Sequence, residues 1–283
     1  MKTVFSAAGV AILVLLTGSM PWAVLGSWNQ RVGLLLPWAV APMAVYLVAY
    51  FQFINGRWTP DRAACWRTNL RANRLTGRMW GVALPAGLLG FGAIMALLAV
   101  SARLVPFPAG ETISAPLGMP APTMFTLLMM QSVVAGVTEE SAFRGYMQSM
   151  IGRRYGIGIA ILAHGTLFGL LHFPNHPRDV VVMLPYYIAV SAMYGGLTWA
   201  TNSIWPALVL HSAGDMVVLT RWWLTGRPEW QMTTSVPPTV WESGFDVSFA
   251  ITAAVAVALS LLTTWSYVSV RQYASGVQPV GES

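Results

Sequence analysis

Eight apolar segments of the chain each approach the length of a membrane-spanning helix, which needs about 20 mostly apolar residues. They cover residues 4–26, 32–54, 79–101, 122–143, 157–173, 180–200, 203–219 and 247–268. Because 55% of the 283 residues are hydrophobic and only 9% are charged, a water-soluble domain with a charged surface is excluded. The sequence therefore predicts an all-α fold, a polytopic bundle of about eight transmembrane helices in a lipid bilayer.

The first apolar segment occupies the position of a secretory signal, but its features favour a retained helix. One lysine precedes a long apolar run, and Met20, Pro21 and Trp22 follow without a clear small-residue cleavage site. Residues 4–26 are therefore predicted to remain as a membrane helix.

The loop at residues 55–78 is strongly basic and predicts how the chain is oriented. It carries six arginines against the single acid Asp61, so by the positive-inside rule it belongs in the cytoplasm. The arginines are Arg57, Arg62, Arg67, Arg71, Arg74 and Arg78. With eight spans, both termini would also be cytoplasmic. We interpret the loop as a lipid-facing anchor, and no nucleic-acid partner is expected.

Two stretches with several prolines, residues 102–121 and 220–246, are predicted to break helices and to face away from the cytoplasm. Tryptophans in the second stretch are typical of the aromatic belt at a membrane surface. They are Trp222, Trp223, Trp230 and Trp241. A single cysteine, Cys65, excludes an internal disulfide and a cysteine-rich metal cluster.

The scarce ionisable side chains are concentrated inside predicted membrane helices. Three of the ten acids and three of the four histidines lie there: Glu139, Glu140, Asp215, His164, His172 and His211. Ionisable groups in hydrocarbon are costly and usually functional. These segments therefore predict the functional site.

The first of these segments holds two neighbouring acids and an arginine. On one helix Glu140 and Arg144 are at i and i+4, so the carboxylate and the guanidinium can pair. Glu139 lies about 100° further around the helix and has no cation next to it in the sequence, which leaves it available as a general base. The alternative is that both acids only tie helices together through Arg144 and other donors.

The second and third segments supply histidines at helical spacing. His164, Phe168 and His172 fall near one stripe of a helix, and Gly165 and Gly169 beside it predict a close approach to another helix. A single interhelical hydrogen bond is an alternative role for either histidine, above all for His164.

His211 and Asp215 are again at i and i+4 and can present one polar face. Two readings of the acids and histidines together stay open. In one, Glu139, His172, His211 and Asp215 bind a zinc-like metal ion with an open position for water. In the other, no metal is needed, because Glu139 and His172 activate water while His211 and Asp215 bind the developing oxyanion.

The three segments together resemble the motifs of a known family. Residues 139–144 (EESAFR) resemble EExxxR, residues 168–172 (FGLLH) resemble FxxxH, and residues 211–215 (HSAGD) resemble HxxxN. In this order, on three successive apolar segments, they are similar to the motifs of CPBP intramembrane proteases, which include the type II CAAX prenyl endopeptidases and bacterial relatives. The resemblance spans roughly residues 122–219.

The resemblance implies a membrane endopeptidase of a bacterial or archaeal cell membrane. Residues 122–219 would form its catalytic core. Residues 1–121 would supply the N-terminal transmembrane helices, and residues 220–283 a loop, the last transmembrane helix and a polar tail, all in one membrane-embedded domain. The implied substrate is a membrane-anchored protein or peptide, with prenylated CAAX peptides as the namesake.

The resemblance also implies a role for each motif. Glu139, helped by His172, would polarise the attacking water, while Glu140 and Arg144 would hold the first motif in place. His211 together with position 215 would stabilise the oxyanion.

Members of the family have been described both as metalloproteases and as metal-free glutamate proteases, so the choice between zinc and no cofactor stays open. Position 215 is Asp where the pattern commonly has Asn, and an ionised carboxylate repels an oxyanion. This departure favours Asp215 as a metal ligand or as a group that orients His211.

Two alternatives belong to other functional classes. One is a catalytically inactive membrane scaffold or immunity protein with the same fold. The other is an ion or proton transporter, in which the same acids and histidines relay ions. A relay needs ionisable groups staggered through the depth of the bilayer, whereas a hydrolase needs them to converge.

Overall fold

The computed structural model describes residues 2–32, 35–107, 113, 116–172, 177–228, 230–231 and 237–276. Its elements are α1 (Lys2–Val32), α2 (Val40–Ile54), η1 (Pro60–Arg62), α3 (Ala63–Leu70), α4 (Gly77–Leu104), α5 (Ala121–Glu139), η2 (Glu140–Met147), α6 (Gln148–Tyr155), α7 (Ile157–His172), α8 (Pro177–Thr201), α9 (Trp205–Thr225), α10 (Val240–Ser243) and α11 (Val247–Gly276). Every regular element in this described part is helical, which confirms the predicted all-α fold.

The helices also confirm a polytopic membrane protein. Among the described residues, five helices are long and apolar enough to cross a membrane, and two shorter apolar helices accompany them. The long ones are Lys2–Val32, Gly77–Leu104, Ala121–Tyr155, Asp179–Thr201 and Val247–Gly276, and the shorter ones are Val40–Ile54 and Ile157–His172. Each of the eight predicted segments contains a helix, but the second, predicted to start at residue 32, becomes helical only at Val40.

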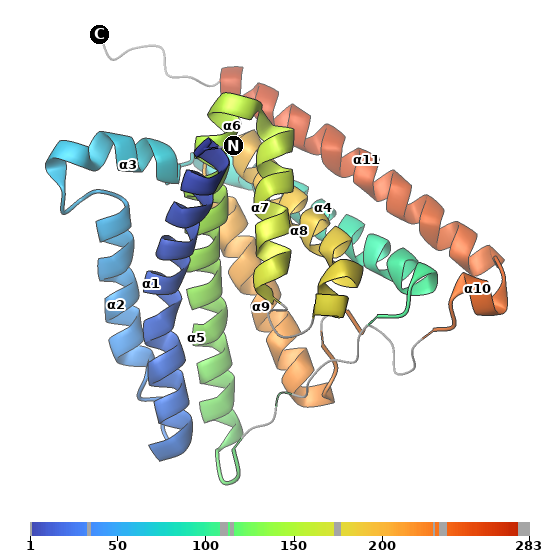
Figure 1. The fold of residues 1–283 in the computed structure, drawn as a ribbon, viewed down its shortest axis with the longest axis horizontal. Helices are drawn as coiled ribbons and strands as arrows, with labels where there is room; N and C mark the ends of the chain where they lie inside the picture. Colours follow the sequence, from blue (N-terminus) through green and yellow to red (C-terminus); the bar gives the residue numbers. More distant parts are fainter. Residues whose placement is uncertain are drawn as a thin grey trace. The chain divides into compact units, whose positions relative to one another are not determined.

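The described chain forms two compact units, of which the first comprises Met1–Ala72, Gly110–Arg154 and Leu208–Glu229. Within it α1, α2 and α5 lie side by side (Figure 1). The buried face of α1 repeats small residues three or four positions apart, among them Ala7 and Ala11. Such a stripe lets neighbouring helices approach closely, which is how helices associate in lipid.

Asn29, a buried polar residue of α1, closes the turn between α1 and α2. Its side-chain amide donates to the carbonyl of Leu36 (3.0 Å), and its side-chain oxygen accepts from the backbone N–H of Ala39 (2.9 Å). Backbone groups without helical partners are costly in a membrane protein. Asn29 therefore stabilises the connection by satisfying one donor and one acceptor.

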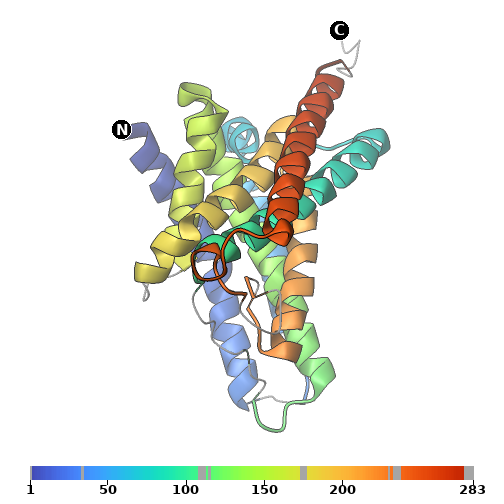
Figure 2. The same cartoon turned by 90° about the vertical axis from the view of Figure 1, so that its right-hand side faces the viewer.

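The second unit comprises Asn73–Ala109, Tyr155–Ala207 and Trp230–Ser283. Within it α11 lies against α4, as Figure 2 also shows, and α7 packs along α8. A Cβ atom added at Gly165 of α7 would lie 3.0 Å from the Cα of Ile188 in α8, and one added at Gly169 would lie 2.9 Å from Leu184. The close approach predicted at these two glycines is therefore confirmed.

The helices are longer than predicted at several ends. The prediction that residues 220–246 break the helix is wrong for residues 220–225, because α9 continues to Thr225. The first residue that favours a turn is Gly226, which has φ of +68°, and its N–H caps the helix by donating to the carbonyl of Trp222. Trp222 and Trp223 consequently lie on a helix.

Two other helices also run further than predicted, and the basic loop is partly helical. α4 runs to Leu104, two residues before Pro106, and α11 runs to Gly276, so the predicted polar tail begins later. The basic loop at residues 55–78 contains the short helices η1 and α3. Residues 277–283 lie outside the described part.

Candidate active site

The two neighbouring acids lie where α5 changes its winding. Glu139 ends α5, and Glu140 begins the π-helix η2, in which every residue from Glu140 to Met147 is buried. A π-helical segment inside a longer helix is uncommon and often marks a functional site. Sequence spacing gave no sign of this change, because the first motif fits an α-helix equally well.

Glu140 and Arg144 form the predicted ion pair. Arg144 Nη1 lies 3.0 Å from Glu140 Oε1, and neither side chain is exposed at all. Guanidinium and carboxylate neutralise each other, which a pair buried in a membrane helix requires. The pairing predicted from the i, i+4 spacing is therefore confirmed.

His211 brings the third motif to the first. Its Nδ1 lies 2.7 Å from Glu140 Oε1, within hydrogen-bonding distance. Its Nε2 lies 3.6 Å from Glu139 Oε2 and 3.7 Å from Asp215 Oδ2, somewhat beyond a direct hydrogen bond. The imidazole is thus anchored on one side by Glu140 and faces two carboxyl groups on the other.

This geometry separates the roles of the acids. An ionised carboxylate only accepts hydrogen bonds, so with Glu140 ionised, Nδ1 of His211 carries the proton that it donates. Glu140 therefore orients the ring, a role that the sequence offered to Asp215. Glu139 and Asp215 are more open than Glu140, with 18% and 29% of their side chains exposed.

The cluster also has room for one exchangeable proton. Three carboxylates and one guanidinium carry a formal charge of −2 when the imidazole is neutral. One further proton on Glu139, His211 or Asp215 would reduce that charge. A site that takes up and returns a proton is what general acid–base catalysis needs.

Gly136 allows α9 to come this close to α5. A Cβ atom added there would collide with Oγ of Ser212 and would lie 3.1 Å from the carbonyl oxygen of Leu208. Ser212 directly follows His211 in the chain, so this contact sets the distance between the histidine and the two glutamates. The partner of Gly136 on α9 could not be predicted from the sequence.

We expect Gly136→Ala to lower the rate of any reaction at this site by about 10²-fold, because it pushes α9 and its imidazole away from Glu139. The matched control is Gly81→Ala, since a Cβ atom added to that helical glycine has nothing within 4 Å. Turnover and thermal unfolding should be measured for both variants. If Gly136→Ala matches the wild type in both, the close approach is not needed.

His172, the histidine of the second motif, belongs to the second unit. Its Nδ1 lies 2.8 Å from the carbonyl oxygen of Phe168, so Nδ1 donates and Nε2 carries the lone pair of the neutral ring. The ring is held between Phe168 and Tyr187, with ring centroids 4.3 Å and 4.5 Å away. The helical spacing of Phe168 and His172 thus favours the tautomer with its proton on Nδ1. This leaves the lone pair on Nε2, the atom that a base needs. Tyr187 was not predicted to contact this histidine.

His164 lies on the same helix, eight residues before His172, and is fully buried. Its burial fits the structural alternative for this histidine. Among described residues, we find no group of three or more His, Cys, Asp and Glu side chains arranged to hold a metal ion. Nδ1 of His211 is engaged with Glu140, and its Nε2 faces the two carboxyl groups of Glu139 and Asp215.

Comparison with known proteins adds one finding. Residues 121–217 match the family of type II CAAX prenyl endopeptidases described as Rce1-like. No curated protein and no solved structure matches the chain. The matched segment is about a third of the sequence and contains all three motifs, from Glu139 to Asp215. It confirms the resemblance to this family for the matched segment.

Proposed function

We propose that this protein is an intramembrane endopeptidase that hydrolyses a peptide bond in a membrane-anchored or prenylated, CAAX-type substrate. The observation that carries the proposal is the convergence of His211 on Glu139, Glu140 and Asp215 inside the segment that matches the prenyl endopeptidase family. Four ionisable groups at one point suit a hydrolase better than a proton relay, which needs groups staggered along a path.

Glu139 acts as the general base in this proposal. Its carboxylate accepts a proton from water as the water oxygen forms a bond to the carbonyl carbon of the substrate. When the carbon–nitrogen bond then breaks, the same carboxyl returns the proton to the leaving amine. That His172 assists Glu139 stays the prediction that its motif makes, and within its own unit its Nε2 is the nitrogen that the Phe168 carbonyl leaves as the acceptor.

His211 stabilises the oxyanion. The N–H at Nδ1 donates a hydrogen bond to Glu140. A second proton, on Nε2, turns the ring into an imidazolium that can donate to the negatively charged oxygen of the tetrahedral intermediate. Asp215 lies on the Nε2 side and helps to keep this proton on the ring. In this proposal no step uses a metal ion, and the chelator experiment below tests that choice.

The proposal is tested by cleavage of a membrane-anchored reporter peptide by the purified, reconstituted protein. We expect His211→Ala to lower the rate by about 10²–10³-fold, the usual cost of losing one oxyanion donor. The matched control is Val209→Ala, which truncates an exposed side chain on the same helix and should cleave normally. Cleavage should also continue in the presence of a chelator.

Three outcomes would contradict parts of this proposal. Normal cleavage by His211→Ala removes the imidazole from the site. Loss of activity with a chelator and its recovery with added zinc supports the metal reading. A wild-type protein that binds but never cleaves reporter peptides of either class, prenylated or otherwise anchored, supports the inactive scaffold.

A further inference from the structure

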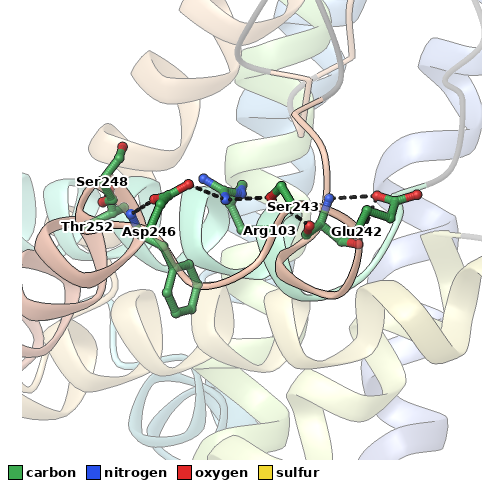
Figure 3. Close-up of polar contacts among 8 residues, drawn as sticks. Arg103, Glu242, Ser243, Asp246, Ser248 and Thr252 are labelled. Atoms are coloured by element: carbon green, nitrogen blue, oxygen red, sulfur yellow. Dashed lines mark hydrogen bonds and ion pairs between the residues drawn. The ribbon is translucent and has the colours of Figure 1, made fainter.

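The short loop from Thr239 to Asp246 in the second unit is held in a fixed shape, although most of it is exposed. The indole N–H of Trp241 donates to the carbonyl of Leu104, the last residue of α4 (2.8 Å). Arg103, also near the end of α4, donates to Asp246 (2.8 Å) and to the hydroxyl of Ser243 (3.3 Å), as Figure 3 shows. The loop is thereby fastened to the end of a membrane-spanning helix.

The charged groups of this loop find their partners locally. Glu242 accepts from the backbone N–H of Thr239 (2.8 Å) and from its hydroxyl (2.9 Å), and the backbone hydrogen bond in particular lowers the pKa of Glu242. Asp246 pairs with Arg103, which lowers the pKa of Asp246, and it also caps α11 by accepting from the N–H of Phe249. Charges that are paired and hydrogen-bonded cost less to move into a region of low polarity.

The same loop points large apolar side chains outward. Trp241 is 72% exposed, Phe245 is 69% exposed and Val247 is 74% exposed. The rings of Trp241 and Phe245 lie edge to face with centroids 6.0 Å apart, and Phe245 also contacts Phe249. A surface of this kind, in which the polar groups face inward and the aromatic groups outward, is unfavourable in water.

The position of the loop points to the membrane as its partner. α4 has 28 residues and α11 has 30, so at about 1.5 Å per residue both are longer than the hydrocarbon core of about 30 Å. Their joined ends, at Leu104 and Val247, therefore reach the boundary between lipid headgroups and acyl chains. Aromatic side chains are enriched at this boundary. Because the indole N–H of Trp241 is already bonded to Leu104, its ring needs no partner among the headgroups and can enter the acyl region.

We propose that the Thr239–Asp246 loop, together with Val247, is an interfacial anchor that inserts Trp241 and Phe245 into the bilayer and sets the depth of α4 and α11. The partner is the lipid surface itself, and no particular headgroup is required. The anchor continues the exposed apolar face of α11, where Ile251 is 59% exposed and Val255 is 45% exposed. It does not depend on the proposed proteolytic activity.

The anchor can be tested with one fluorophore placed on the full-length protein. Because Cys65 is the single cysteine, a Cys65→Ser background allows Phe245→Cys to be labelled alone and reconstituted into vesicles. We expect quenchers attached to lipid acyl chains to quench this label several-fold more strongly than water-soluble iodide does. Asp61→Cys, an exposed position in the basic loop, is the control and should show the reverse order.

Val247→Cys repeats the measurement at a second exposed position, in case Phe245→Cys does not fold. A label at either position that iodide quenches as strongly as the Asp61→Cys label overturns the proposal, because the loop then lies in water. A label that neither quencher reaches also overturns it, since the loop is then covered by protein, such as a second copy of the chain.

Discussion

Replacing Glu139 by glutamine is expected to slow peptide cleavage by about 10²–10⁴-fold, the range that a general base contributes to catalysis. Glutamine has nearly the same size as glutamate, but it cannot accept a proton from water. The side chain ends α5 and is 18% exposed, so the substitution leaves the buried pair of Glu140 and Arg144 in place. Folding should therefore be nearly normal.

The measurement is the initial rate of reporter cleavage, with thermal unfolding of the same preparation to check folding. Glu242→Gln is the matched control, because it makes the same chemical change in the loop of the second unit and should cleave at the wild-type rate. Glu139→Asp keeps a carboxylate one methylene further back and should retain part of the activity. A Glu139→Gln protein that cleaves normally removes Glu139 from the role of base.

The sequence predicted the helices well because hydrophobic length is a strong signal. All eight apolar segments contain helices, and the errors lie at their ends, as in α2, which starts only at Val40, and in α9, which runs on to Thr225 before Gly226. The local i, i+4 pairs also appeared as predicted. Glu140 meets Arg144 at 3.0 Å, and Asp215 faces His211 at 3.7 Å.

Contacts between helices could not be predicted in the same way. That Glu140, rather than Asp215, orients His211 depends on how closely α9 approaches α5, and this distance is set by Gly136 against Ser212. The π-helix η2 is likewise a property of the packed chain, because the spacing of its residues fits an ordinary α-helix. The part that His172 plays in the reaction stays a prediction from its motif and from its fixed tautomer.

The second large effect concerns stability. Arg144→Met is expected to destabilise the protein by about 3–5 kcal/mol, because it leaves the carboxylate of Glu140 buried without its guanidinium. Both side chains are completely buried, at 0% exposure, so water cannot compensate for the loss. Arg153→Met is the matched control. Arg153 lies on α6 in an exposed position and donates to the side-chain oxygen of Asn69 on α3 (2.6 Å), so its loss should cost little.

The double variant Glu140→Met with Arg144→Met separates stability from function. Removing both charges restores most of the lost stability, since a buried ion pair replaced by apolar side chains of similar volume is often tolerated. Cleavage should not recover, because Nδ1 of His211 then has no acceptor at Glu140 to orient the ring.

Thermal unfolding in detergent and the cleavage rate together distinguish the outcomes. If Arg144→Met unfolds at the same temperature as Arg153→Met, the pair does not stabilise the fold. If the double variant cleaves normally, Glu140 does not orient His211, and the imidazole is held by other contacts.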